Sequence, residues 1–128
     1  MAQREVIVLD QSTNRPRLFS DAIKVGKFIY TSGQGPVDPQ TGKTIEGDIL
    51  AQTRQTLENC KSILKKAGSN LEKVIKVSIF LKDISDYPEV NKVYHEYFFN
   101  KPPARSCFAV SSLAREDWRI EIEIVSIS

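Results

Sequence analysis

The residues of this chain best suited to chemistry lie on two alternating stretches near its end. In PPARSCFAV, Arg105 and Cys107 occupy alternate positions of a short predicted strand, so their side chains point from the same face. An arginine keeps its charge and presents parallel donors that match a carboxylate, so a half-buried Arg105 requires an anion. Spacing alone leaves two partners open: the carboxylate of a ligand, or Glu121 and Glu123 of the last predicted strand.

Other polar residues raise similar alternatives. Glu121 and Glu123 share one face of RIEIEIVSI, where both are solvated or one is a general base. Ser32 lies in TSGQGP, where a strand breaks into a glycine-rich loop and its hydroxyl can approach a ligand, although such a stretch is more often just a turn. By the simplest interpretation, Asn91 and His95 are solvent-facing positions of a helix.

Size and composition restrict the class of protein. A chain of 128 residues is the length of one domain, here taken as residues 1–128, and can bury a hydrophobic core. The net charge of +2 and the scattered basic residues do not favour a nucleic acid partner. No apolar run approaches the roughly 20 residues of a membrane span, and the first ten residues do not resemble a targeting segment, so we expect a cytoplasmic protein.

The cysteine and histidine content does not indicate a metal site. Cys60 and Cys107 are far apart, there is no CxxC spacing, and His95 is the single histidine. Cys60 falls within a helical pattern and is interpreted as a small buried hydrophobe, whereas the role of Cys107 stays open.

The first part of the chain reads as strands and turns. EVIVL at 5–9 is a short strand, and residues 11–16 form a loop. AIKV and FIYTS are joined by Gly26 and Lys27, which have the length and the glycine-first chemistry of a type II′ hairpin. The turn-rich GPVDPQTGKT follows as an exposed loop.

Helical periodicity begins at Asp48 and ends at Gly68, a typical residue after a helix C-terminus. The segment 74–82 is a strand, and a second helix begins at Asp86, whose carboxylate is expected to form a capping box with Glu89. In that strand, alternation predicts that one apolar face consists of Ile75, Val77, Ile79 and Leu81.

The resulting order, β-β-β-α-β-α-β-β, predicts an α+β fold with a mixed sheet and both helices on one face. We assign the apolar sets of the last two strands to the helix-covered core: Ser106, Phe108, Val110, Ile120, Ile122 and Ile124. The second face then carries Phe80, Cys107 and Ala109 among charged residues. Such a half-polar face is typical of a contact between copies of a chain.

Five stretches, taken in order and spacing, resemble the RidA (YjgF-like) reactive intermediate deaminases over nearly the whole chain. They are IYTSGQGPVDPQTG, TRQTLENCKSILKKAG, VIKVSIFLKDISDYPEVNKVYHEYF, PPARSCFAV and RIEIEIVSI. The resemblance implies a chorismate-mutase-like α+β domain and a homotrimer with ligand clefts between subunits. It implies a hydrolase of the 2-iminobutanoate/2-iminopropanoate deaminase type, which converts 2-enamine and 2-imine acids such as 2-aminoacrylate into 2-oxo acids and ammonia without a cofactor.

The resemblance also implies roles for individual residues. Arg105 matches the arginine that grips the substrate carboxylate, and Cys107 matches a cysteine near the reacting atoms. Glu121 matches the glutamate that positions or activates water, with one more residue between it and Cys107 than the family usually has. Holding the carboxylate would fix the imine beside that water.

Four further positions would line the cleft. Ser32 and Gly33 match the glycine-rich loop, and Asn91 matches an asparagine of the second helix. Phe19, in PRLFSDA, stands where the family usually has a tyrosine in GPYSQA, so one hydroxyl is missing.

Two other functions remain as alternatives. One is a non-catalytic trimer that binds 2-oxo or imino acids through Arg105 and regulates a partner. The other, a ribonuclease or translation inhibitor as proposed for some relatives, is weakest because the charge is nearly balanced and no basic, aromatic groove is visible in the sequence.

Overall fold

A computed structural model describes residues 3–10 and 17–128, so the loop predicted at 11–16 lies outside the described residues. The order of elements along the chain is β-β-β-α-β-α-β-β, which confirms the predicted α+β fold. The strands are β1 (Arg4–Ile7), β2 (Ala22–Val25), β3 (Phe28–Thr31), β4 (Val74–Leu81), β5 (Ala104–Ala109) and β6 (Ile120–Ile127). The helices are α1 (Ile49–Lys66) and α2 (Tyr87–Tyr97), with short 3-10 turns at Leu71–Lys73 and Ile84–Asp86.

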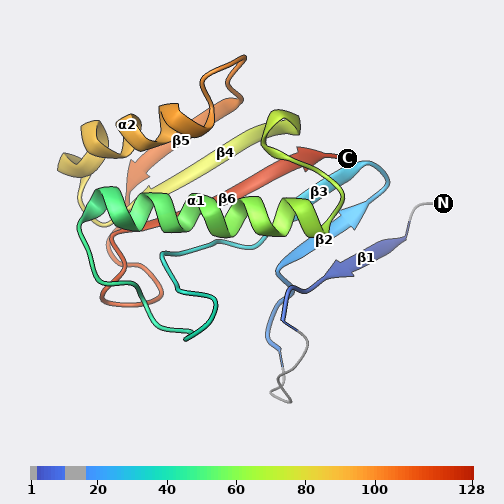
Figure 1. The fold of residues 1–128 in the computed structure, drawn as a ribbon, viewed down its shortest axis with the longest axis horizontal. Coiled ribbons are helices and arrows are strands. Elements are labelled where there is room, and N and C mark those ends of the chain that lie inside the picture. The colour runs from blue at the N-terminus through green and yellow to red at the C-terminus, as the bar shows by residue number, and fades with distance from the viewer. Residues whose placement is uncertain (1–2, 11–16) are drawn as a thin grey trace.

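The strands form one six-stranded mixed sheet in the order β1-β2-β3-β6-β4-β5. Every neighbouring pair is antiparallel except β4 and β5, which are parallel. The C-terminal strand β6 therefore lies inside the sheet and β5 at its edge. Both helices cover the same face, with α1 over β6 and α2 near β5 (Figure 1). The opposite face, called the open face below, carries no helix of the described chain.

Local sequence signals account for the predicted hairpin and for the ends of α1. Gly26 has a φ of 58°, while Lys27 does not have a positive φ, as a type II′ turn requires. The Asp48 carboxylate accepts a hydrogen bond from the Ala51 N–H at 2.9 Å and caps the first turn. Gly68, with a φ of 85°, ends the helix in the left-handed conformation that glycine adopts without strain.

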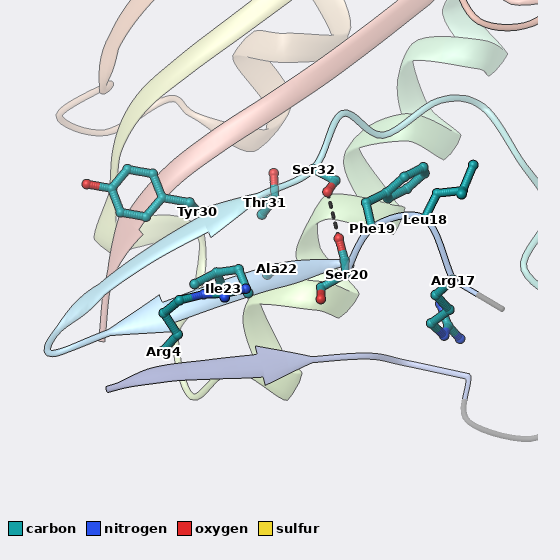
Figure 2. Close-up of a pocket in the computed structure, with 10 residues that line it drawn as sticks. All are labelled: Arg4, Arg17, Leu18, Phe19, Ser20, Ala22, Ile23, Tyr30, Thr31 and Ser32. Atoms are coloured by element: carbon teal, nitrogen blue, oxygen red, sulfur yellow. Dashed lines mark hydrogen bonds between the residues drawn. The ribbon is translucent and has the colours of Figure 1, made fainter. Parts of the chain in front are cut away.

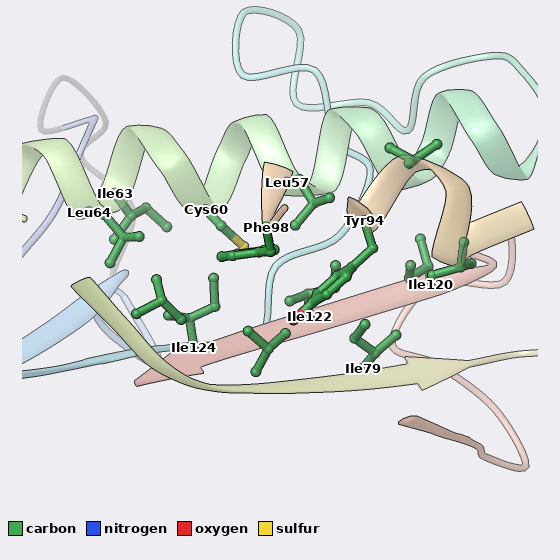
Figure 3. Packing of buried hydrophobic residues seen from close by; sticks show 14 of the residues in the cluster. Leu57, Cys60, Ile63, Leu64, Ile79, Tyr94, Phe98, Ile120, Ile122 and Ile124 are labelled. Carbon is green, nitrogen blue, oxygen red and sulfur yellow. The ribbon is translucent and has the colours of Figure 1, made fainter. Parts of the chain in front are cut away.

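The core lies between α1, α2 and the helix-side face of the sheet. Leu57 and Leu64 of α1 pack above Ile120, Ile122 and Ile124 of β6, as Figure 3 shows. These side chains are almost completely excluded from solvent. Cys60 is fully buried among them, and burial raises the pKa of its thiol to about 12, which confirms its interpretation as a small hydrophobe.

Two local predictions were wrong. Ile75 is exposed because a β-bulge between Val74 and Lys76 shifts the alternation by one residue, and Val74 takes the buried position. The Asp86 side chain makes no capping hydrogen bond within the described part of the chain. The Asp86 carboxylate instead accepts two hydrogen bonds from the Arg119 guanidinium, at 2.7 Å and 3.3 Å. A bidentate ion pair at a buried position is stronger than one hydrogen bond from a backbone N–H.

The face assignment of β5 was also wrong, and this correction matters for function. Parallel pairing places Arg105 beside Val77 and Cys107 beside Ile79, both of which are buried beneath the helices. Arg105 and Cys107 therefore face the helix layer. Ser106 and Phe108 lie on the open face, where the Phe108 ring packs edge-on against Phe80 with the ring centroids 5.3 Å apart, and Val110 follows the end of the strand.

Candidate functional site

The first group of candidate residues, called the helix-side group, lies between β5 and α2. Arg105 donates a hydrogen bond from Nη2 to the Tyr87 hydroxyl at 3.0 Å. Its guanidinium carbon lies 4.7 Å from the centroid of the Tyr94 ring and 5.4 Å from that of Tyr87. Stacking on aromatic rings orients the guanidinium while leaving most of its N–H donors unused.

Arg105 does not pair with Glu121 or Glu123, the alternative partners that the sequence left open. Glu121 and Glu123 pair with Phe80 and Ser78 on the open face, whereas Arg105 projects from the helix-side face. Within residues 3–10 and 17–128, Arg105 takes part in no ion pair. The positive charge is thus positioned but has no carboxylate partner in the described chain.

Cys107 and Asn91 complete the helix-side group. Burial raises the pKa of the Cys107 thiol, and the nearby Arg105 charge only partly opposes that effect, so the thiol stays protonated at neutral pH. Asn91 lies on the same face of α2 as Tyr87 and Tyr94 because these positions are four and three residues apart.

The environment of Asn91 differs from the solvent-facing interpretation. Asn91 is half-buried, and its Oδ1 has no hydrogen-bond partner among the described residues. The Tyr94 hydroxyl is also buried and also has no hydrogen-bond partner among the described residues. Unpartnered buried acceptors are uncommon and mark places where a ligand or another chain can supply a donor. His95 is exposed, as predicted.

The second group, called the open-face group, surrounds Glu121 on β6. Two backbone hydrogen bonds between Gln34 and Ile122, of 2.7 Å and 2.9 Å, tie the glycine-rich loop to β6. This brings Gly33 against Glu121, and a Cβ at position 33 would lie 2.1 Å from Oε2 of Glu121. A side chain at position 33 would therefore displace the Glu121 carboxylate from its present position.

Ser32 is held firmly at the edge of this group. Its hydroxyl donates to the Ser20 carbonyl oxygen at 2.6 Å, and its N–H donates to the Asp21 carbonyl oxygen at 2.9 Å. Figure 2 shows the first of these bonds in a cavity of about 510 Å³, with Phe19 and Tyr30 toward opposite ends. The Ser32 hydroxyl retains lone pairs that can accept a hydrogen bond from a ligand.

A second cavity adjoins Glu121 directly. It has a volume of about 320 Å³ and is lined by Phe19, Ser32, Gly33, Ala114, Trp118 and Glu121. Burial raises the pKa of the Glu121 carboxyl, and the nearby Glu123 charge adds to the effect. A carboxylate with a raised pKa is a stronger base, which suits a group that removes a proton from water.

The structure does not bring the two groups together within one chain. Arg105 and Cys107 lie on the edge strand β5 and face the helices, whereas Glu121 lies on β6 and faces the other way, with β4 between the two strands. Of the sequence-predicted residues, Phe19, Ser32, Gly33 and Glu121 share one cavity. Arg105, Cys107 and Asn91 belong to the other group.

Sequence analysis missed three residues of these groups. Tyr87 and Tyr94 hold Arg105, and their seven-residue spacing, with Asn91 between them, is the signal that places all three on one helix face. Trp118 lines the cavity beside Glu121, and its position directly before the last predicted strand carries no distinctive signal.

Among the described residues, no helix is long and apolar enough to span a membrane. No group of three or more His, Cys, Asp or Glu side chains in that part of the chain is placed to hold a metal ion.

Comparison with known proteins gives a consistent match. A family model described as endoribonuclease L-PSP matches residues 12–128. A RutC family protein of Pyrococcus horikoshii is 46% identical over 123 residues, covering 96% of this chain and 97% of the relative.

Two solved structures are similar over nearly their full length. RidA from an Antarctic Psychrobacter is 34% identical with a TM-score of 0.88, covering 98% of this chain and 100% of that one. Escherichia coli TdcF, crystallised with bound serine, is 33% identical with a TM-score of 0.86, covering 97% of this chain and 98% of that one.

Proposed function

We propose that this chain, which belongs to the YjgF/RidA/RutC (endoribonuclease L-PSP) family, is a hydrolytic deaminase of 2-enamine and 2-imine acids. Its products are 2-oxo acids and ammonia, the reaction class of 2-iminobutanoate/2-iminopropanoate deaminases. The observation that carries the proposal is Arg105, a guanidinium held by two tyrosines and free of ion pairs within the described residues. Such a group is a receptor for a carboxylate. The serine bound to the TdcF relative is a small amino acid with a carboxylate of this kind.

The active unit is a homotrimer in which each cleft combines both groups. Arg105, Cys107 and Asn91 come from one copy, and Glu121 and Ser32 come from the open face of its neighbour. Their positions on opposite faces of one sheet support this arrangement, because the two groups cannot meet within one chain. The open face has the apolar character of an interface, since it exposes Val6, Phe28, Tyr30 and Phe108. A stable monomer in light scattering at micromolar concentration would overturn the trimer.

The reaction is a hydrolysis and therefore needs no redox cofactor. An enamine first takes a proton from water on its terminal carbon and releases one from its nitrogen, which gives the imine without net proton uptake. Glu121 then removes a proton from water as the water oxygen bonds to the imine carbon, and passes that proton to the nitrogen to give a carbinolamine. In the second half, Glu121 takes the hydroxyl proton as the carbonyl forms, the C–N bond breaks, and ammonia leaves with that proton.

Arg105 and Cys107 serve binding and orientation. The guanidinium fixes the substrate carboxylate, so the imine carbon stays beside the water that Glu121 activates. The protonated thiol of Cys107 forms a wall of the cleft rather than a nucleophile, since only the thiolate attacks. Asn91 contributes its unpartnered Oδ1 as an acceptor for an N–H of the substrate.

A second function is favoured by one observation. Phe19 places an exposed ring, without a hydroxyl, where the family usually has a tyrosine. A cleft that lacks this group is also suited to binding 2-oxo or imino acids without turnover, as a regulatory trimer would.

One assay separates the two functions. Purified protein is mixed with freshly generated 2-aminoacrylate, and oxo-acid formation is followed against the spontaneous rate. Acceleration supports the deaminase. An unchanged rate, with 2-oxobutyrate still binding in calorimetry, supports the regulatory binder instead.

A further inference from the structure

The cavity beside Glu121 has both polar and apolar lining. Glu121 and Ser32 supply polar side chains, and in the proposed function the imine reacts at Glu121. Phe19, Ala114 and Trp118 supply apolar surface. The volume of about 320 Å³ exceeds what a methyl or methylene group can fill.

Trp118 is a rigid wall of this cavity. Only 8% of the residue is exposed, and its ring lies so close to Gly35 that a Cβ there would be 2.4 Å from the ring atoms. The indole N–H donates to the Thr44 hydroxyl at 3.1 Å, and the Arg115 guanidinium lies 5.5 Å from the ring centroid. The indole is thus fixed on several sides, so it cannot swing aside to change the size of the cavity.

Phe19 and Ala114 differ from Trp118 because both are exposed. Phe19 exposes 66% of its surface in the single chain, so its ring is available to an apolar group that enters the cavity. An apolar ligand group placed against this ring removes apolar surface of both partners from water. Ala114 carries only a methyl group, so the wall it forms leaves room that a larger residue would fill.

We infer that this cavity is the subsite for the substrate side chain, and that the preferred substrates are 2-imino acids with a branched or aromatic apolar side chain. The inference rests on the proposed function, because it takes Glu121 as the reacting end. Each additional buried methylene raises kcat/KM about fourfold, at roughly 0.8 kcal/mol per methylene. The kcat/KM for the imine of leucine is therefore about 60-fold higher than that for the imine of alanine, since the leucine side chain has three more carbons.

The test compares imines of increasing side-chain size. Imino acids are generated in situ by an amino-acid oxidase from alanine, 2-aminobutyrate, norvaline, leucine and phenylalanine, with semicarbazide as the competing trap. The protein as isolated is expected to show a kcat/KM that rises along the series. In Ala114→Leu, which fills the cavity, the leucine-to-alanine ratio is expected to fall at least tenfold, about the effect of two lost methylene contacts.

Ser112→Leu is the matched control, because it adds the same side chain to the same loop outside this cavity. It is expected to leave the ratio unchanged. Turnover that does not rise with side-chain size, or an Ala114→Leu ratio equal to that of the parent, would overturn the subsite while leaving the deaminase intact.

If no imine is turned over, the deaminase fails but the subsite is still tested. Calorimetry then compares 4-methyl-2-oxopentanoate with pyruvate. Tighter binding of the larger acid, lost in Ala114→Leu, supports the subsite, and equal affinities overturn it.

Discussion

The separation of Arg105 and Glu121 on opposite faces of the sheet predicts complementation between inactive variants. Arg105→Ala removes the proposed carboxylate receptor from the helix side of a subunit, and Glu121→Ala removes the proposed base from the open face. Each variant alone has every cleft damaged, so each is expected to be inactive. A mixed trimer contains one junction at which an intact Arg105 meets an intact Glu121 of the neighbouring copy.

The size of the recovery follows from the symmetry. When equal amounts of the two variants assemble at random, about three-quarters of the trimers are mixed. Each mixed trimer, in either composition, has one complete cleft out of three. The expected activity is therefore about one quarter of that of the parent protein.

The measurement uses the aminoacrylate assay on variants refolded together, with native mass spectrometry to count the mixed trimers. Folded variants combined without refolding are the control, because activity there reports only spontaneous subunit exchange. A second control is the double variant Arg105→Ala/Glu121→Ala refolded with the parent. The double variant supplies neither intact residue, so a cleft that it shares with a parent subunit stays incomplete. Mixed trimers that form in the expected proportion but stay inactive would show that the two residues do not share a cleft.

Four further substitutions test single residues. Arg105→Lys keeps the charge but loses the paired donors, so transition-state stabilisation should fall by about 1.5–3 kcal/mol and kcat/KM roughly 10- to 150-fold in the same assay. An unchanged kcat/KM would contradict the receptor role of Arg105. Gly33→Ala places a Cβ against the Glu121 carboxylate and should lower kcat more than carboxylate binding, measured by kinetics beside 2-oxobutyrate calorimetry. Phe19→Tyr restores the hydroxyl and should raise kcat on small imino acids; equal kinetics on several of them would show that the hydroxyl is irrelevant. Because the folded-state pKa of Glu121 is raised, its protonated form stabilises the fold below the ordinary glutamate pKa, and this stability is lost as the pH rises through the raised value. Glu121→Gln should therefore melt at a higher temperature than the parent at pH 8, with the difference vanishing toward pH 4 in calorimetric scans.

Elements with strong local signals could be predicted from the sequence, and the exceptions have local causes. The cap at Asp48 and the left-handed Gly68 are decided by neighbouring residues, so the bounds of α1 followed from the sequence. The bulge after Val74 has no such signal, because it depends on the pairing of β4 with β6. Asp86 had an appropriate capping pattern, but Arg119, 33 residues away, competed for its carboxylate.

Arg105, Cys107 and Glu121 were selected as candidates by type and spacing, and Phe19, Gly33 and Asn91 only by the family resemblance. The sheet face of Arg105 and Cys107 was predicted wrongly. Assigning apolar residues to the core works for β6, which is covered along its length, and its isoleucines are buried as predicted. It fails for β5, because an edge strand is covered only partly and α2 offers it tyrosines rather than aliphatic side chains. A sequence pattern cannot show which rings will lie over an arginine.

The partial cover of the edge strand β5, which made the face assignment wrong, also limits where Arg105 can contact a ligand. A guanidinium under α2 can reach a substrate only at the exposed edge of β5, and no hydrogen-bonded neighbour covers that edge within the described chain. A base on the open face of β6 cannot reach around two strands to that edge, since neighbouring strands are separated by about 4.8 Å. In the proposed trimer, a second copy whose open face lies against this edge would supply the base without rearranging either group. The proposed activity therefore depends on assembly, and dilution below the dissociation constant of the trimer should abolish turnover while the helices and the sheet remain folded in circular dichroism.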